Sequence, residues 1–118
     1  MTTTLFGISV DARNAEAQAQ FWAKALHRQV NDGATVDSAS VAPGEDPDRG
    51  PLLMFHKVPE DKTVKNRVHF DLQAPDVVAE ADRLTSLGAR QIRALSENNH
   101  QWISFTDPEG NEFDLVAG

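Results

Sequence analysis

The 118-residue sequence contains no cysteine. This absence excludes disulfide bonds, thiolate nucleophiles and zinc sites built from cysteine. It is also typical of proteins that stay in a reducing compartment. The first residues, Met1 to Thr4, carry no basic stretch, and no apolar run long enough for a signal peptide or a membrane span follows them. We therefore expect a cytoplasmic protein without a leader or a membrane anchor.

The chain is also short of positive charge. It has 11 Lys and Arg residues against 18 Asp and Glu residues, a formal net charge of −7 at pH 7. Such a chain would be repelled by the phosphates of nucleic acids and by anionic membrane surfaces, so we expect neither as a partner. A glycine-rich phosphate loop and a nucleophile-elbow motif are missing as well.

What the sequence does contain is an internal repeat. Arg28-Gln29-Val30 recurs as Arg90-Gln91-Ile92. We call the distance along the chain between these two motifs (90 − 28) the longer repeat offset. Asp46-Pro47-Asp48 recurs as Asp107-Pro108-Glu109, and this pair defines an offset that is shorter by one position (107 − 46). Neither half is large enough to bury a core alone, so two copies of one small unit predict a pseudo-symmetric fold.

Each half has the same predicted order of elements, namely a strand, a helix and a run of short strands. We expect helices near residues 14–27 and 76–88, with Asn14 and Asp76 as N-caps. The predicted class is α+β, with two tandem βαβββ modules forming a curved, partly closed mixed sheet around a cavity. Module one covers about residues 5–58 and module two about residues 67–117, within a single domain spanning residues 1–118.

Strict alternation in the first strand of each module predicts which side chains face the helix and which face the cavity. The apolar set is expected to meet the helices: Phe6, Ile8, Val10, Val68, Phe70 and Leu72. The opposite set is expected on the open face, together with a residue of the last strand: Gly7, Ser9, Asp11, His69, Asp71 and Asp114.

His69 and Asp114 are the candidate catalytic residues. An imidazole and a carboxylate that converge in a cavity can act as an acid–base pair, or can hold a divalent metal with help from further groups. They can equally form a structural hydrogen bond. The residue types alone leave these three interpretations open.

His56 ends the predicted strand that begins at Leu52. If the longer repeat offset applies, His56 points into the cavity beside Met54; if the shorter one applies, His56 points toward the helix. We favour the longer offset, because the helix and the strand after it both keep it. His56, Met54, Trp102 and Ser9 are the candidate ligand-binding residues.

The chain resembles the vicinal oxygen chelate superfamily of glyoxalase, bleomycin-resistance and extradiol-dioxygenase proteins over about residues 5–116. The resemblance rests on the Asn66–Leu72 strand, on the Leu87-Gly88-Ala89 helix end and, above all, on the closing Asp107–Leu115 motif. Within this superfamily, the chain most resembles a small glyoxalase-like branch. The resemblance implies two βαβββ modules, a small-molecule ligand between them and a homodimer.

In metal-dependent members of this superfamily, the first and last strands of each module supply four ligands to a divalent ion. The resemblance places His69 and Asp114 at two of these positions, but Gly7 and Leu52 or Leu53 at the other two. Glycine and leucine cannot ligate. We therefore expect no cofactor, or a labile divalent metal held by His56, His69 and Asp114.

Two functions follow from the resemblance. The first is a glyoxalase-like lyase, isomerase or dioxygenase-type enzyme with a degenerate metal site, in which His69 and Asp114 are central. The second is a non-catalytic protein that binds or sequesters a small molecule, as resistance proteins of this family do. The missing half of the ligand set favours the second function or a metal-free enzyme.

Overall fold

The computed structural model describes residues 2–45, 50–98 and 100–118. The chain divides into two compact units, Met1–Asp61 and Lys62–Gly118. Each unit contains one mixed sheet and one helix, which confirms the α+β class and the two βαβββ modules. The single-domain assignment stays a prediction. Of the repeated motifs, Asp46-Pro47-Asp48 lies outside the described residues.

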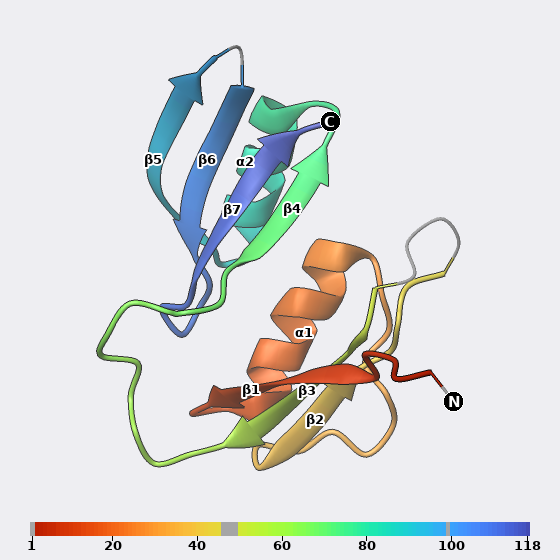
Figure 1. Cartoon of the computed structure of the whole chain (residues 1–118). Coiled ribbons are helices and arrows are strands. Elements are labelled where there is room, and N and C mark those ends of the chain that lie inside the picture. The colour runs from red at the N-terminus through yellow and green to blue at the C-terminus, as the bar shows by residue number, and fades with distance from the viewer. Residues whose placement is uncertain (1, 46–49, 99) are drawn as a thin grey trace. The chain divides into compact units, whose positions relative to one another are not determined.

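The first unit consists of β1 (Gly7–Ala12), α1 (Ala15–Leu26), β2 (Ser38–Val41) and β3 (Leu52–Lys57) (Figure 1). The strand order is β1-β3-β2, with β1 parallel and β2 antiparallel to the central β3. One strand of the expected βαβββ order is reduced in this unit to a single bridge between Val30 and Val41.

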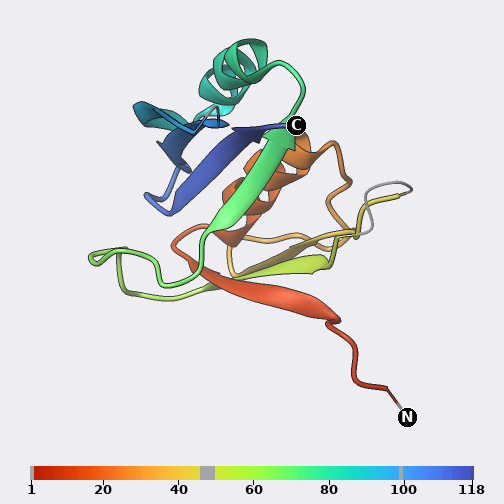
Figure 2. The same cartoon turned by 45° about the horizontal axis from the view of Figure 1, so that its top comes forward.

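The second unit consists of β4 (Phe70–Ala74), α2 (Val77–Leu87), β5 (Arg90–Glu97), β6 (His100–Thr106) and β7 (Glu112–Ala117). The order is β4-β7-β6-β5, in which only β4 and β7 are parallel. Figure 2 shows α2 covering one face of this sheet. No helix in the described parts of the chain is long and apolar enough to cross a membrane.

Both helices begin at the predicted caps. The Asn14 side chain accepts a hydrogen bond from the Ala17 backbone N–H at 3.0 Å, and the Asp76 side chain accepts one from Ala79 at 3.1 Å. Each cap satisfies one of the backbone donors left free in the first turn. The separation of the two caps (76 − 14) equals the longer repeat offset, so the helices follow the repeat.

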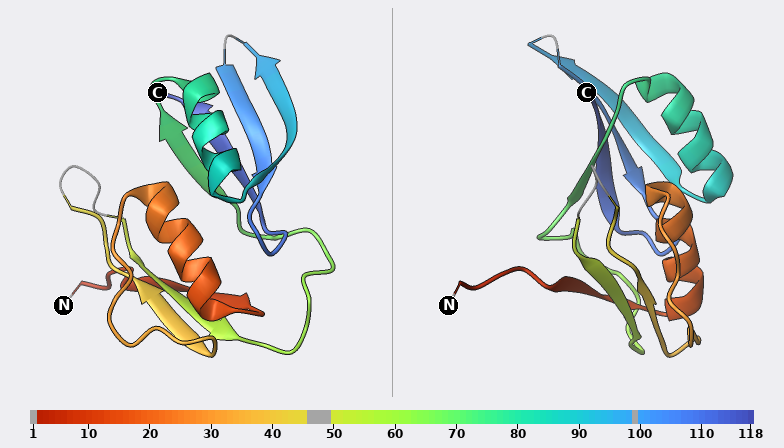
Figure 3. Two further views of the ribbon diagram at one scale, coloured as in Figure 1. Left: turned by 180° about the vertical axis from the view of Figure 1, so that it is seen from behind. Right: turned by 90° about the vertical axis from the view of Figure 1, so that its right-hand side faces the viewer.

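Each helix packs on one face of its own sheet, as Figure 3 shows for both units. Phe21 and Trp22 of α1 are buried in edge-to-face contact, with ring centroids 5.2 Å apart, and belong to the core. In the second unit Phe105 and Phe113 stack at 5.3 Å. Burying these aromatic rings is a major source of stability for such small units.

Two residues expected to face the helices do not. Phe6 is 74 % exposed and Val68 is 69 % exposed, so the prediction was wrong for both. The reason is that β1 begins at Gly7 and β4 begins at Phe70, so the strand alternation does not extend back to these residues.

Candidate functional site

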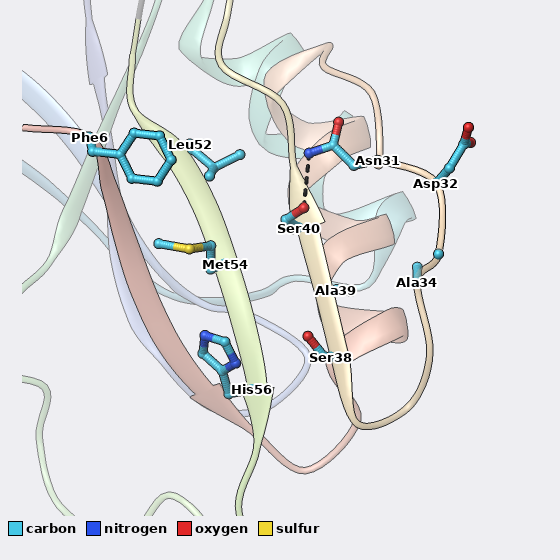
Figure 4. Close-up of a pocket in the computed structure, with 11 residues that line it drawn as sticks. Phe6, Asn31, Asp32, Ala34, Ser38, Ala39, Ser40, Leu52, Met54 and His56 are labelled. Carbon is cyan, nitrogen blue, oxygen red and sulfur yellow. Dashed lines mark hydrogen bonds between the residues drawn. The ribbon is translucent and has the colours of Figure 1, made fainter.

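The open face of the first sheet carries a pocket of about 370 Å³. It is lined from β2, β3, the segment before β1 and the loop before β2 (Figure 4). The lining residues are Phe6, Asn31, Asp32, Gly33, Ala34, Ser38, Ala39, Ser40, Leu52, Met54 and His56. The volume is at the lower end of the range that small-molecule sites occupy.

One side of the pocket is an apolar column that ends in an imidazole. Leu52, Met54 and His56 alternate along β3 with Leu53 and Phe55, which are buried against α1. Because successive strand residues point to opposite faces, the first three share the open face. His56 therefore lies beside Met54, as the longer repeat offset required. That these two residues bind a ligand stays a prediction.

Phe6 completes this column, since its ring lies next to Leu52 in Figure 4. The strand alternation assigned Phe6 to the core and so missed it as a pocket residue. Its position depends on where β1 begins, and an alternation pattern does not define that point.

The other side of the pocket is polar and comes from β2 and the loop before it. Asn31 donates from Nδ2 to Ser40 Oγ at 2.9 Å, and its backbone N–H donates to the Ser40 carbonyl at 2.9 Å. Ser40 Oγ therefore accepts one hydrogen bond and keeps its own proton to donate. Ser38 and Ser40 are the cross-strand partners of His56 and Met54. The alternation Ser38-Ala39-Ser40-Val41 was the sequence signal for this polar row, and it was missed.

Ser9 and Trp102 lie outside this pocket. Ser9 is on the same face of the first sheet, where it pairs with Met54, but it does not line the cavity. Trp102 belongs to the second unit, where its partners are Leu95 on β5 and Val116 on β7. It is half-buried. Their roles in ligand binding stay predictions.

Asp114 and His69 each have a partner of their own within the second unit. Asp114 Oδ1 accepts a hydrogen bond from Ser104 Oγ at 2.7 Å. His69 precedes β4, and its Nε2 lies 3.0 Å from the Asn66 carbonyl oxygen. Because a carbonyl can only accept, Nε2 must carry the proton in this bond, which leaves the lone pair on Nδ1. A joint acid–base role for the two residues stays a prediction.

The connector before β4 is held by Glu112, a residue that sequence reasoning missed. Glu112 Oε1 pairs with Lys62 Nζ at 2.9 Å, and Oε2 accepts the Asn66 backbone N–H at 2.9 Å. Burial alone would raise the pKa of Glu112, but the Lys62 and backbone hydrogen bonds and the Lys62 charge together lower it to about 2. Through Asn66, the same carboxylate supports the hydrogen bond to His69.

The strand registers show which residue of module one stands where Asp114 stands in module two. Ser9 pairs with Met54, and Asp71 pairs with Asp114. The separation of Ser9 and Asp71 (71 − 9) equals that of the helix caps, whereas the separation of Met54 and Asp114 (114 − 54) is shorter by two positions. Met54, rather than Leu52 or Leu53, therefore occupies the position of the closing carboxylate.

Gly7 has no ligating group, and a side chain placed there would require its neighbours to shift. A Cβ added at Gly7 would lie 2.9 Å from Met54 Cε and 3.0 Å from the Leu52 carbonyl oxygen. Together, Gly7 and Met54 offer neither the imidazole nor the carboxylate that a borderline divalent ion prefers. Among the residues that the structure describes, no three or more His, Cys, Asp or Glu form a group that could hold a metal ion. The donors present do not fit the four-ligand site.

Comparisons with known proteins agree with this architecture. The family model for the glyoxalase-like domain matches residues 7–116. Among curated proteins, none matches the sequence.

Solved structures share the fold at low sequence identity. A FosX variant from Listeria monocytogenes, in complex with Mn(II) and 1S,2S-dihydroxypropylphosphonic acid, has a TM-score of 0.76 and 15% identity, covering 100% of this chain and 92% of its own. Lactoylglutathione lyase from Agrobacterium tumefaciens has a TM-score of 0.67 and 14% identity, covering 100% and 96%. A glyoxalase/bleomycin resistance protein/dioxygenase family enzyme from Burkholderia phytofirmans has a TM-score of 0.74 and 13% identity, covering 94% and 95%.

At these identities the neighbours establish the fold, and their ligands remain properties of those proteins. The family match spans both helices and all the described strands except the last residue of β7. It includes the closing Asp107–Leu115 motif from which the resemblance was first inferred. The chain therefore belongs to the glyoxalase-like domain family, within the vicinal oxygen chelate superfamily.

Proposed function

We propose that this protein binds a small molecule in the pocket of the first unit without using a divalent metal. The pocket itself is the observation that carries the proposal. It combines an apolar column (Phe6, Leu52 and Met54) with polar groups that have hydrogen-bonding capacity to spare. This combination of apolar lining and a few placed polar atoms is typical of ligand sites. The poor fit of Gly7 and Met54 to a metal supports the second half of the proposal.

In this site the ligand's apolar part lies on the β3 column, and its polar atoms reach β2. Ser40 Oγ donates a hydrogen bond, and Asn31 Oδ1 accepts one, since Asn31 uses its Nδ2 on Ser40. His56 closes one end of the column and offers a ring nitrogen to the ligand. A neutral imidazole both donates and accepts, so it suits a hydroxyl or a carbonyl group equally.

A second candidate function is a metal-free enzyme, which the surroundings of His56 favour. Its cross-strand partners on the open face are Asp11 on β1 and Ser38 on β2. A carboxylate on one side can orient the ring, and a hydroxyl on the other can relay a proton, which are the requirements of a general base. The catalytic roles of His69 and Asp114 belong to the same enzyme hypothesis.

The proposal includes a homodimer. β5 is the last strand of its sheet, and seven of its eight residues are exposed. Long exposed edges invite pairing, and pairing of two identical chains covers them symmetrically.

The binding function is tested by screening a fragment library against the full chain by ligand-observed NMR. Met54→Lys places a charge in the apolar column and is expected to abolish most hits. The matched control is Val78→Lys, which changes another apolar residue, 71 % exposed on α2, and should keep them. Phe6→Ala serves as a milder pocket variant. If the hits survive both pocket variants as well as they survive the control, the proposal is wrong.

A further inference from the structure

We infer that the ligand of this pocket is an uncharged aromatic compound that carries a hydroxyl or carbonyl group on one edge, and that it is not an anion. The inference rests on the proposed function and adds the chemical class of the ligand. It follows from three properties of the pocket, which are its charge, its apolar column and its polar row.

The pocket offers an anion neither a guanidinium nor an ammonium group. None of its lining residues is Lys or Arg, and the lone acidic one, Asp32, points away from β3 in Figure 4. The described Arg residues and Lys57 of the first unit are held by other groups. These contacts are Arg13 with Asp61, Arg28 with the Pro51 carbonyl at 2.9 Å, and Lys57 with Asp37 at 4.0 Å.

Lys24, the other described Lys of the first unit, lies in the last turn of α1. That helix packs on the opposite face of the sheet. A phosphonate or carboxylate entering the pocket would lose water without gaining the Arg or Lys partner that usually replaces it, and this desolvation disfavours binding.

The apolar column suits a flat ring. The Phe6 ring, the Leu52 side chain and the Met54 thioether lie in sequence along β3 in Figure 4. Sulfur–aromatic and aromatic–aromatic contacts both favour an aromatic partner over an aliphatic one. Because Phe6 is 74 % exposed, its ring gains the most from being covered by such a partner.

The polar row fixes where the ligand's own polar atom must lie. Ser38 and Ser40 stand on β2 directly across from His56 and Met54. Neighbouring strands are about 5 Å apart, so a two-ring compound resting on β3 brings one edge over these hydroxyls. Ser38 Oγ has no hydrogen bond within the described residues, and Ser40 Oγ keeps its proton. An acceptor or hydroxyl on that edge of the ligand satisfies both.

The test compares 2-naphthol with 2-naphthoate, which share their rings and differ in charge. Heteronuclear NMR titration of the full chain at neutral pH gives both dissociation constants. We expect 2-naphthol to bind at least about tenfold more tightly, because the carboxylate finds no Lys or Arg partner in the pocket to offset its desolvation. Its shifts should centre on the amides of β2 and β3. Equal or tighter binding of 2-naphthoate would overturn the inference.

Variants of Ser40 make the test independent of these two probes. Ser40→Ala should raise the dissociation constant of 2-naphthol about three- to tenfold, which is the usual effect of losing one neutral hydrogen bond. Ser40→Lys supplies the missing cation and should reverse the preference toward 2-naphthoate. Ser96→Ala and Ser96→Lys, on exposed β5, are the matched controls and should change neither constant.

Failure of this inference can be separated from failure of the proposed function. If library fragments bind and are lost in Met54→Lys, but they are anionic or aliphatic, the pocket is a ligand site and the inferred class is wrong. If 2-naphthol binds with the expected preference and is unaffected by Met54→Lys, its site lies elsewhere and the inferred class is wrong, whereas the proposed function is wrong only if the library hits also survive the pocket variants.

Discussion

Glu112 shows how much structure a single side chain can fix. Its two carboxylate oxygens hold Lys62 and the Asn66 backbone, both in the connector that leads to β4. Its side chain is 26 % exposed, and that of Lys62 is 20 % exposed, so water screens this pair less than an ordinary surface pair. The lowered pKa of about 2 is the electrostatic consequence of that arrangement.

We predict that Glu112→Gln lowers the free energy of unfolding by about 1–2 kcal/mol at neutral pH, because the charged partner of Lys62 is lost. The folded pKa lies below the unfolded one, so Glu112 contributes its full stability above about pH 4.5. It loses this contribution as the pH falls toward about 2. The difference between variant and wild type should therefore shrink over that interval.

Urea unfolding followed by tryptophan fluorescence at several pH values measures this difference. The control is Glu97→Gln, at an exposed position of β5 in the same unit. A stability difference that is the same at neutral and at acidic pH would contradict the prediction.

At the residue scale, side chains on the central strands were predictable and those at strand ends were not. The alternation of β3 correctly placed Met54 and His56 on the open face. The alternation expected for the first strand failed for Phe6, because β1 begins one residue later, at Gly7. His69 also lies before its strand, where a bond to its neighbour Asn66 determines the ring position.

The two helices end differently although they begin alike. α2 ends at Gly88, with φ 122°, and α1 ends at His27, with φ 56°. Both residues occupy conformations in which a Cβ is strained, and glycine alone adopts them without cost. Module one therefore carries a local strain that module two avoids.

We predict that His27→Gly stabilises the protein by about 0.5–1 kcal/mol, because it removes the Cβ from a left-handed position. The reverse exchange, Gly88→Ala, should destabilise by about 1 kcal/mol or more. Thermal and urea unfolding of both variants measure these effects. A destabilised His27→Gly variant would mean that the imidazole makes a contribution larger than the strain.

At the element scale, helices were easier to predict than the short strands between them. Asn14 and Asp76 mark the helix starts by a local chemical rule, which holds regardless of tertiary context. The strand near Val30 became a single bridge to Val41, made by the hydrogen bonds from Asn31 N–H to the Ser40 carbonyl and from Ala42 N–H to the Gln29 carbonyl, and the chain turns soon after it at Gly33, with φ 91°. Such pairing depends on the neighbouring strand, which a short stretch of sequence does not reveal.

At the scale of the whole molecule, a four-ligand metal site would need side chains from both modules. Four ligands are needed from four strands, and Gly7 and Met54 stand at two of those places.

We therefore predict no stoichiometric binding of zinc, nickel or manganese at low micromolar concentration. Isothermal titration calorimetry of the full chain checks this. The prediction would be refuted by one-to-one binding that is abolished in His69→Ala and unchanged in Glu97→Gln.

The overall fold could be predicted because the repeat appears twice and each copy supports the other. Two helix caps at one offset, with alternating strands around them, leave few arrangements of a small α+β protein. The register could not be predicted in the same way. A shift by two positions between the modules keeps every side chain on its expected face, so the hydrophobic pattern does not reveal it.

Met54 couples the two positions of module one at which the superfamily's metal ligands are expected. The residue stands where a carboxylate would ligate, and its terminal methyl group also lies 2.9 Å from the place where a side chain at Gly7 would begin. A histidine at position 7 therefore requires the Met54 side chain to move, and a shorter carboxylate side chain at position 54 vacates the same space. The two positions thus constrain each other within one sheet, and building a metal site here means changing both of them together.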